Sequence, residues 1–302
     1  MFEDFVEEYI EGDGANLFVR RSGPKNAKPI VLLHGYPQTS AMWHAVAPIL
    51  SRSYQVICPD LRGYGASEKP NSDARHYPYS KRAMAKDIIA MMKRLGHNKF
   101  LVGAHDRGAR VAHRLGLDYP DSIEAMVLLD IAPTREMYAG TSANFAQIYW
   151  HWFFLTQPNP LPEKMISADP EGFWKLKCLN QAHGQNPFSP EALAEYLASF
   201  KDPNTIHSTC EDYRAAASID IEHDDADQGK KLTMPILALW AKFGVIESCF
   251  NALDLWQQRA LHVEGEALAA THYMAEEIPQ EVTKHMLEFF SQYPIHKKET
   301  AQ

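Results

Sequence analysis

The stretch from Phe100 to Arg110, F-L-V-G-A-H-D-R-G-A-R, limits what this chain can fold into more than any other part. A short apolar run leads into small residues and then a helix-compatible segment, so we expect a sharp turn between a strand and a helix with Asp106 at its apex. Ala104 and Gly108 are small, as such an elbow requires where the two backbones pass close together. A carboxylate at the apex attacks an sp³ carbon that carries a leaving group, and water then cleaves the ester.

An ordinary structural role for Asp106 stays open at this point. An aspartate in front of a helix is often a plain N-cap, which stabilises the first turn by about 1 kcal/mol. The choice between a cap and a nucleophile therefore depends on which other reactive side chains the fold brings to the same place.

Composition and charge restrict the classes of protein to which the chain can belong. Its 302 residues are 45% hydrophobic, which is enough for the core of one or two globular domains. The acidic N-terminus and the lack of an apolar run of about 20 residues predict neither export nor membrane insertion, so we expect a cytoplasmic protein. The cysteines and histidines lack metal-binding spacing and no phosphate-binding glycine motif occurs, so we expect no metal and no cofactor. The net charge of −8 argues against nucleic acid as a partner.

Strand and helix patterns alternate along the chain. Apolar or alternating runs predict eight strands, at residues 5–10, 16–21, 29–33, 54–58, 100–102, 125–130, 232–240 and 259–264. The first two flank a Gly-Asp-Gly turn and are expected to form an antiparallel hairpin. Helical spacing from Met84 to Leu95 predicts a helix before the elbow strand, and another begins near Pro279. This alternation predicts an α/β fold with a mostly parallel, doubly wound sheet that binds ligands at the carboxyl ends of its strands.

The alternation stops after the sixth strand. The segment 134–220 is expected to be wholly helical, with Ser189 as an N-cap and Pro190 at a first helical position. We therefore divide the chain into a core domain at 1–133, a helical lid at 134–220 and the second part of the core at 221–302. A lid over the carboxyl ends of the strands would exclude water and add side chains to the site.

Three further candidates fall at strand exits. The third strand ends in a His-Gly pair, so the N–H of Tyr36 can point into the crevice as an oxyanion donor, although a simple β-turn explains the same residues. Asp130 ends the sixth strand, and the exit of the seventh contains no aspartate. His272 lies in the loop after the last strand. The ordered set of Asp106, Asp130 and His272 predicts a nucleophile, an orienting acid and a base.

Two cations lie next to the expected nucleophile. Arg107 and Arg110 are three residues apart in the first turn of the elbow helix and share a face. A helix N-terminus already carries about half a positive charge, so two more cations are unfavourable there unless an anion binds. A carboxylate held by guanidinium forks fits best. Surface arginines paired with Asp118 or Asp121 are the alternative.

Taken together, these motifs resemble the α/β-hydrolase superfamily over nearly the whole chain, and most closely its fluoroacetate (haloacetate) dehalogenases. The resemblance rests on H-G-Y-P-Q at 34–38, H-D-R-G-x-R at 105–110, Asp130, the lid pair His151-Trp152, and His272. It implies a nucleophile, base and orienting acid at Asp106, His272 and Asp130, a carboxylate clamp at Arg107 and Arg110, and halide-pocket donors at His151, Trp152 and Tyr213. This chain has Ala104 and Ala241 where the family usually has glycine.

The resemblance also implies a reaction. The clamp holds a small anionic 2-haloacid so that Asp106 displaces the halide, and His272 then activates a water that cleaves the ester. The N–H groups of Tyr36 and Arg107 are expected to stabilise the oxyanion. The expected product is glycolate, and a homodimer is the expected assembly.

Two rival functions share part of this pattern. An epoxide hydrolase of the same fold would share the aspartate and the histidine, but it uses lid tyrosines to protonate an alkoxide and needs no arginine pair. A non-catalytic binder of a small carboxylic acid would also keep Arg107 and Arg110. It would usually have lost part of the triad.

Overall fold

An eight-stranded sheet forms the centre of the structure, a computed structural model that describes residues 1–293. The strand order is β1-β2-β4-β3-β5-β6-β7-β8, and all neighbours from β4 onward are parallel, whereas β1, β2 and β4 pair antiparallel. The strands are Val6–Glu11 (β1), Asn16–Ser22 (β2), Pro29–Leu33 (β3), Gln55–Pro59 (β4), Phe100–His105 (β5), Ile123–Leu129 (β6), Ile236–Ala241 (β7) and Val263–Leu268 (β8). The predicted mostly parallel sheet is confirmed.

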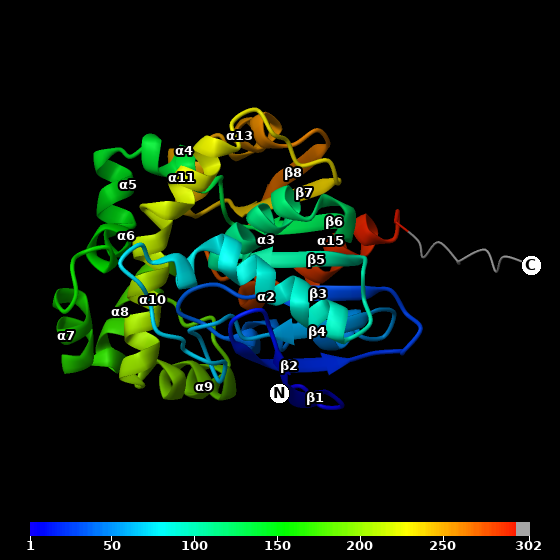
Figure 1. Cartoon of the computed structure of the whole chain (residues 1–302), viewed down its shortest axis with the longest axis horizontal. Helices are drawn as coiled ribbons and strands as arrows, with labels where there is room; N and C mark the ends of the chain where they lie inside the picture. Colours follow the sequence, from blue (N-terminus) through cyan, green and yellow to red (C-terminus); the bar gives the residue numbers. More distant parts are fainter. Residues whose placement is uncertain (294–302) are drawn as a thin grey trace, which may run out of the picture.

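Helices cover both faces of this sheet. Figure 1 shows α2 (Lys81–Arg94) and α3 (Asp106–Asp118) in front of the sheet and α15 (Pro279–Phe290) behind it. Ser80 caps α2 by accepting a hydrogen bond from the N–H of Ala83. Most apolar side chains of α2 are buried. The shorter elements are α1 (Ala47–Leu50), α12 (Val245–Cys249), α13 (Ala252–Arg259), α14 (Met274–Glu277), and the 3₁₀ turns η1 (Ser40–Trp43), η2 (Tyr77–Tyr79) and η3 (Pro120–Ser122). No helix within residues 1–293 is long and apolar enough to cross a membrane.

Eight helices lie between β6 and β7, and we call them the insert. They are α4 (Thr134–Ala139), α5 (Ala143–Ile148), α6 (Trp150–Leu155), α7 (Leu161–Ala168), α8 (Pro170–Gln181), α9 (Pro190–Phe200), α10 (Pro203–Ala216) and α11 (Ile219–Ala226). Helices α5 to α10 gather at the end of the sheet where β5 leads into α3 (Figure 1). The predicted boundary at residue 220 falls inside α11, and the division into core and lid stays a prediction.

Two predicted strands begin four residues later in the structure than in the prediction, whereas the other six begin within two residues of it. The seventh begins at Ile236 rather than at residue 232, because Leu232 forms only an isolated bridge to Ala260 and Pro235 has no N–H to donate. The last strand is present, but its predicted bounds of about 259–264 were wrong by four residues at each end. Arg259 instead ends α13, where its guanidinium pairs with Glu136 at 3.0 Å, and the strand runs from Val263 to Leu268.

Candidate active site

Asp106 lies at the junction of β5 and α3, as predicted. The strand ends at His105 and the helix begins at Asp106, whose backbone φ of +45° is uncommon for a residue with a side chain. A Cβ at Gly108 would lie 2.5 Å from the carbonyl oxygen of His34, so the close backbone approach expected at this elbow is present. The turn places the Asp106 carboxylate at the carboxyl end of the central strands, in a position that is 3% exposed.

The loop after β3 contacts this carboxylate directly. The N–H of Tyr36 donates to Asp106 Oδ1 at 2.9 Å, and a Cβ at Gly35 would come within 2.6 Å of the Asp106 Cβ. Burial by itself disfavours the charge, yet interactions with His272, His105 and Arg110 hold the pKa of Asp106 well below its usual value. Asp106 is therefore an ionised carboxylate with one oxygen already bound by a backbone donor.

His272 and Asp130 form a hydrogen-bonded pair beside Asp106. His272 Nδ1 lies 2.6 Å from Asp130 Oδ2, and Asp130 Oδ1 accepts from the N–H of Ala241 at 2.9 Å. With Nδ1–H donated to Asp130, His272 Nε2 is left as the basic nitrogen. Nε2 lies 4.0 Å from Asp106 Oδ2, which is too long for a hydrogen bond. The three predicted residues are thus adjacent in the order that a triad requires.

Arg107 and Arg110 are both buried, at 0% and 3% exposed. The alternative of surface arginines paired with Asp118 or Asp121 is therefore wrong; Asp118 instead pairs with Arg82. Arg110 Nη1 donates to Thr134 Oγ1 at 2.9 Å and to a backbone carbonyl. Within the described chain, Arg107 Nη1 and Arg110 Nε are buried without a hydrogen-bond partner. Each guanidinium next to Asp106 thus retains donor capacity that an anionic ligand could use.

The aromatic residues predicted for a halide pocket surround the two arginines. The Arg107 guanidinium carbon lies 4.1 Å from the centre of the Tyr213 ring, and that of Arg110 lies 4.6 Å from the centre of the Trp152 ring. His151 contacts Tyr213 with ring centres 5.8 Å apart. The indole nitrogen of Trp152 is buried and has no partner in the part of the chain that is described. The structure thus brings all three side chains, from α6 and α10, to the arginine pair.

Sequence reasoning missed a carboxylate that holds Arg107. Asp212 of α10 accepts from Arg107 Nε at 2.9 Å and from Nη2 at 2.6 Å, and both side chains are fully buried. Tyr64 and Lys81 also donate to Asp212. The only local signal was that Asp212 directly precedes Tyr213, which cannot reveal a partner more than a hundred positions away in the sequence. Two of the three guanidinium nitrogens of Arg107 are therefore fixed by the insert.

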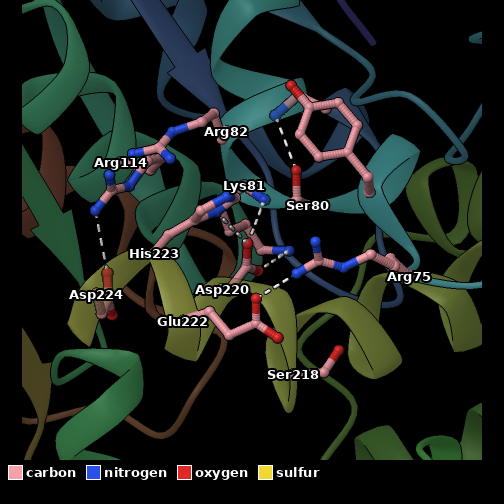
Figure 2. A network of polar contacts seen from close by, with 12 residues as sticks. Arg75, Ser80, Lys81, Arg82, Arg114, Ser218, Asp220, Glu222, His223 and Asp224 are labelled. Atoms are coloured by element: carbon pink, nitrogen blue, oxygen red, sulfur yellow. Dashed lines mark hydrogen bonds and ion pairs between the residues drawn. The ribbon is translucent and has the colours of Figure 1, made fainter. Parts of the chain in front are cut away.

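Further polar contacts join the insert to the core helices. Figure 2 shows Lys81 of α2 beside Asp220 of α11, and the N–H of Lys81 donates to Asp220 Oδ1 at 2.9 Å. In the same view, Arg114 of α3 contacts Asp224 at 3.2 Å. Asp220 Oδ2 has no hydrogen-bond partner within residues 1–293 and lies 3.7 Å from the Lys81 ammonium. The contact between α11 and the core is thus built largely from charged side chains.

Asp220 allows a prediction on pH and stability. Burial raises its pKa from 3.8 to about 6, against the opposing effect of Lys81. The folded chain then keeps a proton that the unfolded chain releases between about pH 4 and pH 6, so the free energy of unfolding falls as pH rises through that window. Asp220→Asn cannot titrate, and it should gain up to about 3 kcal/mol relative to the parent between those pH values.

Urea unfolding of both proteins at about pH 4.5 and pH 7 measures this gain. Asp225→Asn is the control, because Asp225 lies on the same stretch of chain and is exposed. A stability difference between Asp220→Asn and the parent that stays constant with pH would contradict the prediction.

A pocket of about 330 Å³ opens beside His272. It is lined by His272, by Tyr149 and Gln181 of the insert, and by Lys242 in the loop after β7. A larger hollow of about 1000 Å³ lies next to Lys28 at the opposite ends of the strands and does not include the triad. Of these two hollows, only the pocket at His272 is lined by a residue of the predicted triad.

Comparisons with known proteins identify the family of the chain. Residues 28–246 match the model of the alpha/beta hydrolase fold family. A fluoroacetate dehalogenase of Burkholderia sp. is 41% identical over 96% of this chain and 95% of its own length. A soluble epoxide hydrolase of Corynebacterium sp. (strain C12) is 35% identical over 87% of this chain and 90% of its own. A crystal structure assigned to the α/β hydrolases, from Nostoc sp. PCC 7120, superposes with a TM-score of 0.93 and 46% identity over 96% of this chain and 99% of that one.

Proposed function

This chain belongs to the α/β-hydrolase fold family, and we propose that within it the enzyme is a haloacetate dehalogenase that converts fluoroacetate or chloroacetate and water into glycolate and halide. One observation supports this substrate class most strongly. Two buried arginines beside an ionised aspartate each keep a guanidinium N–H without a partner in the described structure. A carboxylate of the substrate fills both positions and balances the buried charge.

The first chemical step forms an ester. With its carboxylate on Arg107 and Arg110, the haloacetate presents its α-carbon to Asp106. Oδ2 is the attacking oxygen, because Oδ1 is held by the Tyr36 N–H. A bond forms between Oδ2 and the α-carbon while the carbon–halogen bond breaks, and the halide leaves with the electron pair. Donors on Trp152, His151 and Tyr213 receive the departing halide.

The second step hydrolyses that ester. His272 Nε2 takes a proton from water, and the hydroxide adds to the Asp106 carboxyl carbon. Negative charge develops on Oδ1, where the N–H groups of Tyr36 and Arg107 stabilise it. Collapse of this intermediate breaks the bond between the carboxyl carbon and Oδ2, and the proton on His272 passes to the glycolate that leaves. The Asp106 carboxylic acid that remains releases its proton to solvent, which restores the carboxylate. Asp130 keeps the histidine in the required tautomer throughout.

Release of halide and glycolate from fluoroacetate and from chloroacetate tests this proposal. Both products should appear in equal amounts, whereas a neutral haloalkane of similar size should react far more slowly because it cannot use the arginine pair. Styrene oxide is the second arm, since Tyr213 could also protonate an epoxide oxygen and one relative is an epoxide hydrolase. Diol formation from styrene oxide without halide release from either acid would favour the epoxide hydrolase instead.

The halide pocket carries a prediction of its own. Fluoride is a poor leaving group that depends on hydrogen-bond donors already aimed at it, whereas chloride leaves more readily. We expect Trp152→Phe and Tyr213→Phe, which keep a ring and delete the donor, to slow fluoroacetate far more than chloroacetate. Each lost donor should cost about 2–4 kcal/mol on fluoroacetate.

The measured quantity is the ratio of kcat/KM for the two acids. Trp150→Phe is the matched control, because Trp150 lies on the same helix as Trp152 and is 38% exposed. If the ratio is the same in all variants, the halogen preference does not reside in these side chains.

A further inference from the structure

Helix α8 of the insert carries three polar side chains on its buried face. Trp174, Lys177 and Gln181 are spaced by three and four residues, so they lie along one side of the helix. They are 0%, 2% and 9% exposed. A buried lysine is uncommon, and none of the carboxylates in residues 1–293 forms an ion pair with Lys177. Charge pairing therefore does not explain why Lys177 is buried on this face of α8.

The first two side chains hold the loop that contains the Tyr36 N–H. Trp174 Nε1 donates to the carbonyl oxygen of Pro37 at 3.0 Å, and Lys177 Nζ donates to that of Tyr36 at 3.2 Å. These are successive carbonyls, and the N–H of Tyr36 on the other side of the same loop donates to Asp106 Oδ1. Two adjacent turns of α8 thus fix the segment that supplies the expected oxyanion donor.

The same face also reaches the loop of the base. Lys177 Nζ lies 3.4 Å from the hydroxyl of Tyr273, and that hydroxyl donates to Gln181 Oε1 at 2.9 Å. Tyr273 directly follows His272 in the chain. One helix of the insert therefore contacts the two core loops that flank the Asp106 carboxylate.

Simple packing does not explain Lys177. Burial lowers the pKa of this lysine, so the folded state opposes its charge. Its ammonium lies 5.0 Å from the centre of the Tyr36 ring, which offsets part of that cost. An apolar side chain of similar length would fill the same volume without desolvating a cation. The polar contacts to Tyr36 and Tyr273 are what an apolar residue could not supply.

We propose that Trp174 and Lys177 are positioning residues that hold the carbonyls of Pro37 and Tyr36 and thereby keep the Tyr36 N–H aimed at Asp106 Oδ1. The inference rests on the proposed function. During ester formation negative charge leaves Asp106, whereas during ester hydrolysis a full charge develops on Oδ1. A well-aimed donor therefore matters most in the second step, and loosening the loop slows hydrolysis more than alkylation.

Rapid-quench kinetics with chloroacetate separate the two steps, because chloride appears in the first and glycolate in the second. In Lys177→Met and Trp174→Phe we expect the hydrolysis rate constant to fall by about 10-fold or more and the alkylation rate constant to change far less. The ester on Asp106, followed by intact-mass spectrometry, should then become the main species during turnover. Lys177→Gln, which keeps a donor, should recover part of the hydrolysis rate.

Lys175→Met is the matched control, because Lys175 lies on the same helix and pairs with Glu171 at the surface. It should behave like the parent. The positioning role is overturned if both steps slow equally in Lys177→Met and Trp174→Phe, or if the ester accumulates in neither variant. It is also overturned if one variant fails to fold and the other shows the parental ratio of the two rate constants. If the parent itself releases no chloride, the proposed function fails instead, so the two failures are distinguishable.

Discussion

Asp106→Ala is expected to release neither halide nor glycolate from a haloacetate, whereas His272→Asn should release one equivalent of halide and then stall as the ester. The structure separates the two roles, because Asp106 Oδ2 is free to attack and His272 Nε2 is 4.0 Å from it without a hydrogen bond. Loss of a general base typically costs about 10²–10⁴-fold in rate. The ester should therefore persist long enough to be detected by intact-mass spectrometry after mixing.

Each variant is the control for the other, since the adduct should appear only in His272→Asn.

Isotope labelling adds a second readout. In a single turnover of the parent in H₂¹⁸O, the label should enter Asp106 rather than glycolate, because hydroxide adds to the carboxyl carbon and Oδ2 leaves with the product. Full turnover by Asp106→Ala would remove the nucleophile from the mechanism, and label found in glycolate would indicate direct attack of water on the substrate.

Arg110→Lys is expected to lose about 2–5 kcal/mol in kcat/KM for haloacetates although the charge is kept. The lysine ammonium cannot reproduce the planar fork, which in Arg110 donates to Thr134 through Nη1 and leaves Nε without a partner among the residues described. The measurement is kcat/KM for chloroacetate and for a neutral haloalkane, and only the former should fall steeply.

Arg114→Lys provides the matched control. Arg114 is also buried in α3, at 3% exposed, but its partners are Asp118, Asp224 and Asp227 rather than a ligand position. We expect this variant to unfold at a lower temperature and to keep its kcat/KM. Equal losses on the acid and the neutral substrate in Arg110→Lys would show that Arg110 supports the fold and does not bind substrate.

The sequence predicted the parts of the site that depend on local pattern. The elbow at Asp106 and the exit at Asp130 each follow an apolar strand, His272 follows the last strand, and parallel strands bring their carboxyl ends to one edge of the sheet. The sequence could not predict Asp212 or Lys177 as neighbours of this edge. Both lie on insert helices whose apolar spacing specifies a buried face but not the loop that this face covers.

The bounds of the last strands were harder to predict for a related reason. β8 alternates half-exposed and exposed residues up to the buried Leu268, because it is an edge strand with solvent on one side. Residues 260–262, between α13 and β8, include the apolar pair Ala260 and Leu261. This pair extended the predicted strand to residues that precede the real one.

The ion pair between Arg107 and Asp212 has a consequence for protein engineering. Arg107 belongs to the host scaffold, whereas the carboxylate that sets the direction of its guanidinium comes from α10. Replacing the segment between β6 and β7 with that of a homologue therefore also replaces the residue that orients the Arg107 guanidinium. A graft without an acidic side chain at position 212 would leave the buried charges of Arg107 and Lys81 without this counter-ion, which would lower the folding stability by about 3–5 kcal/mol. Chimeras of this enzyme should be chosen first by whether the donor segment carries that aspartate, and only then by the shape of its pocket.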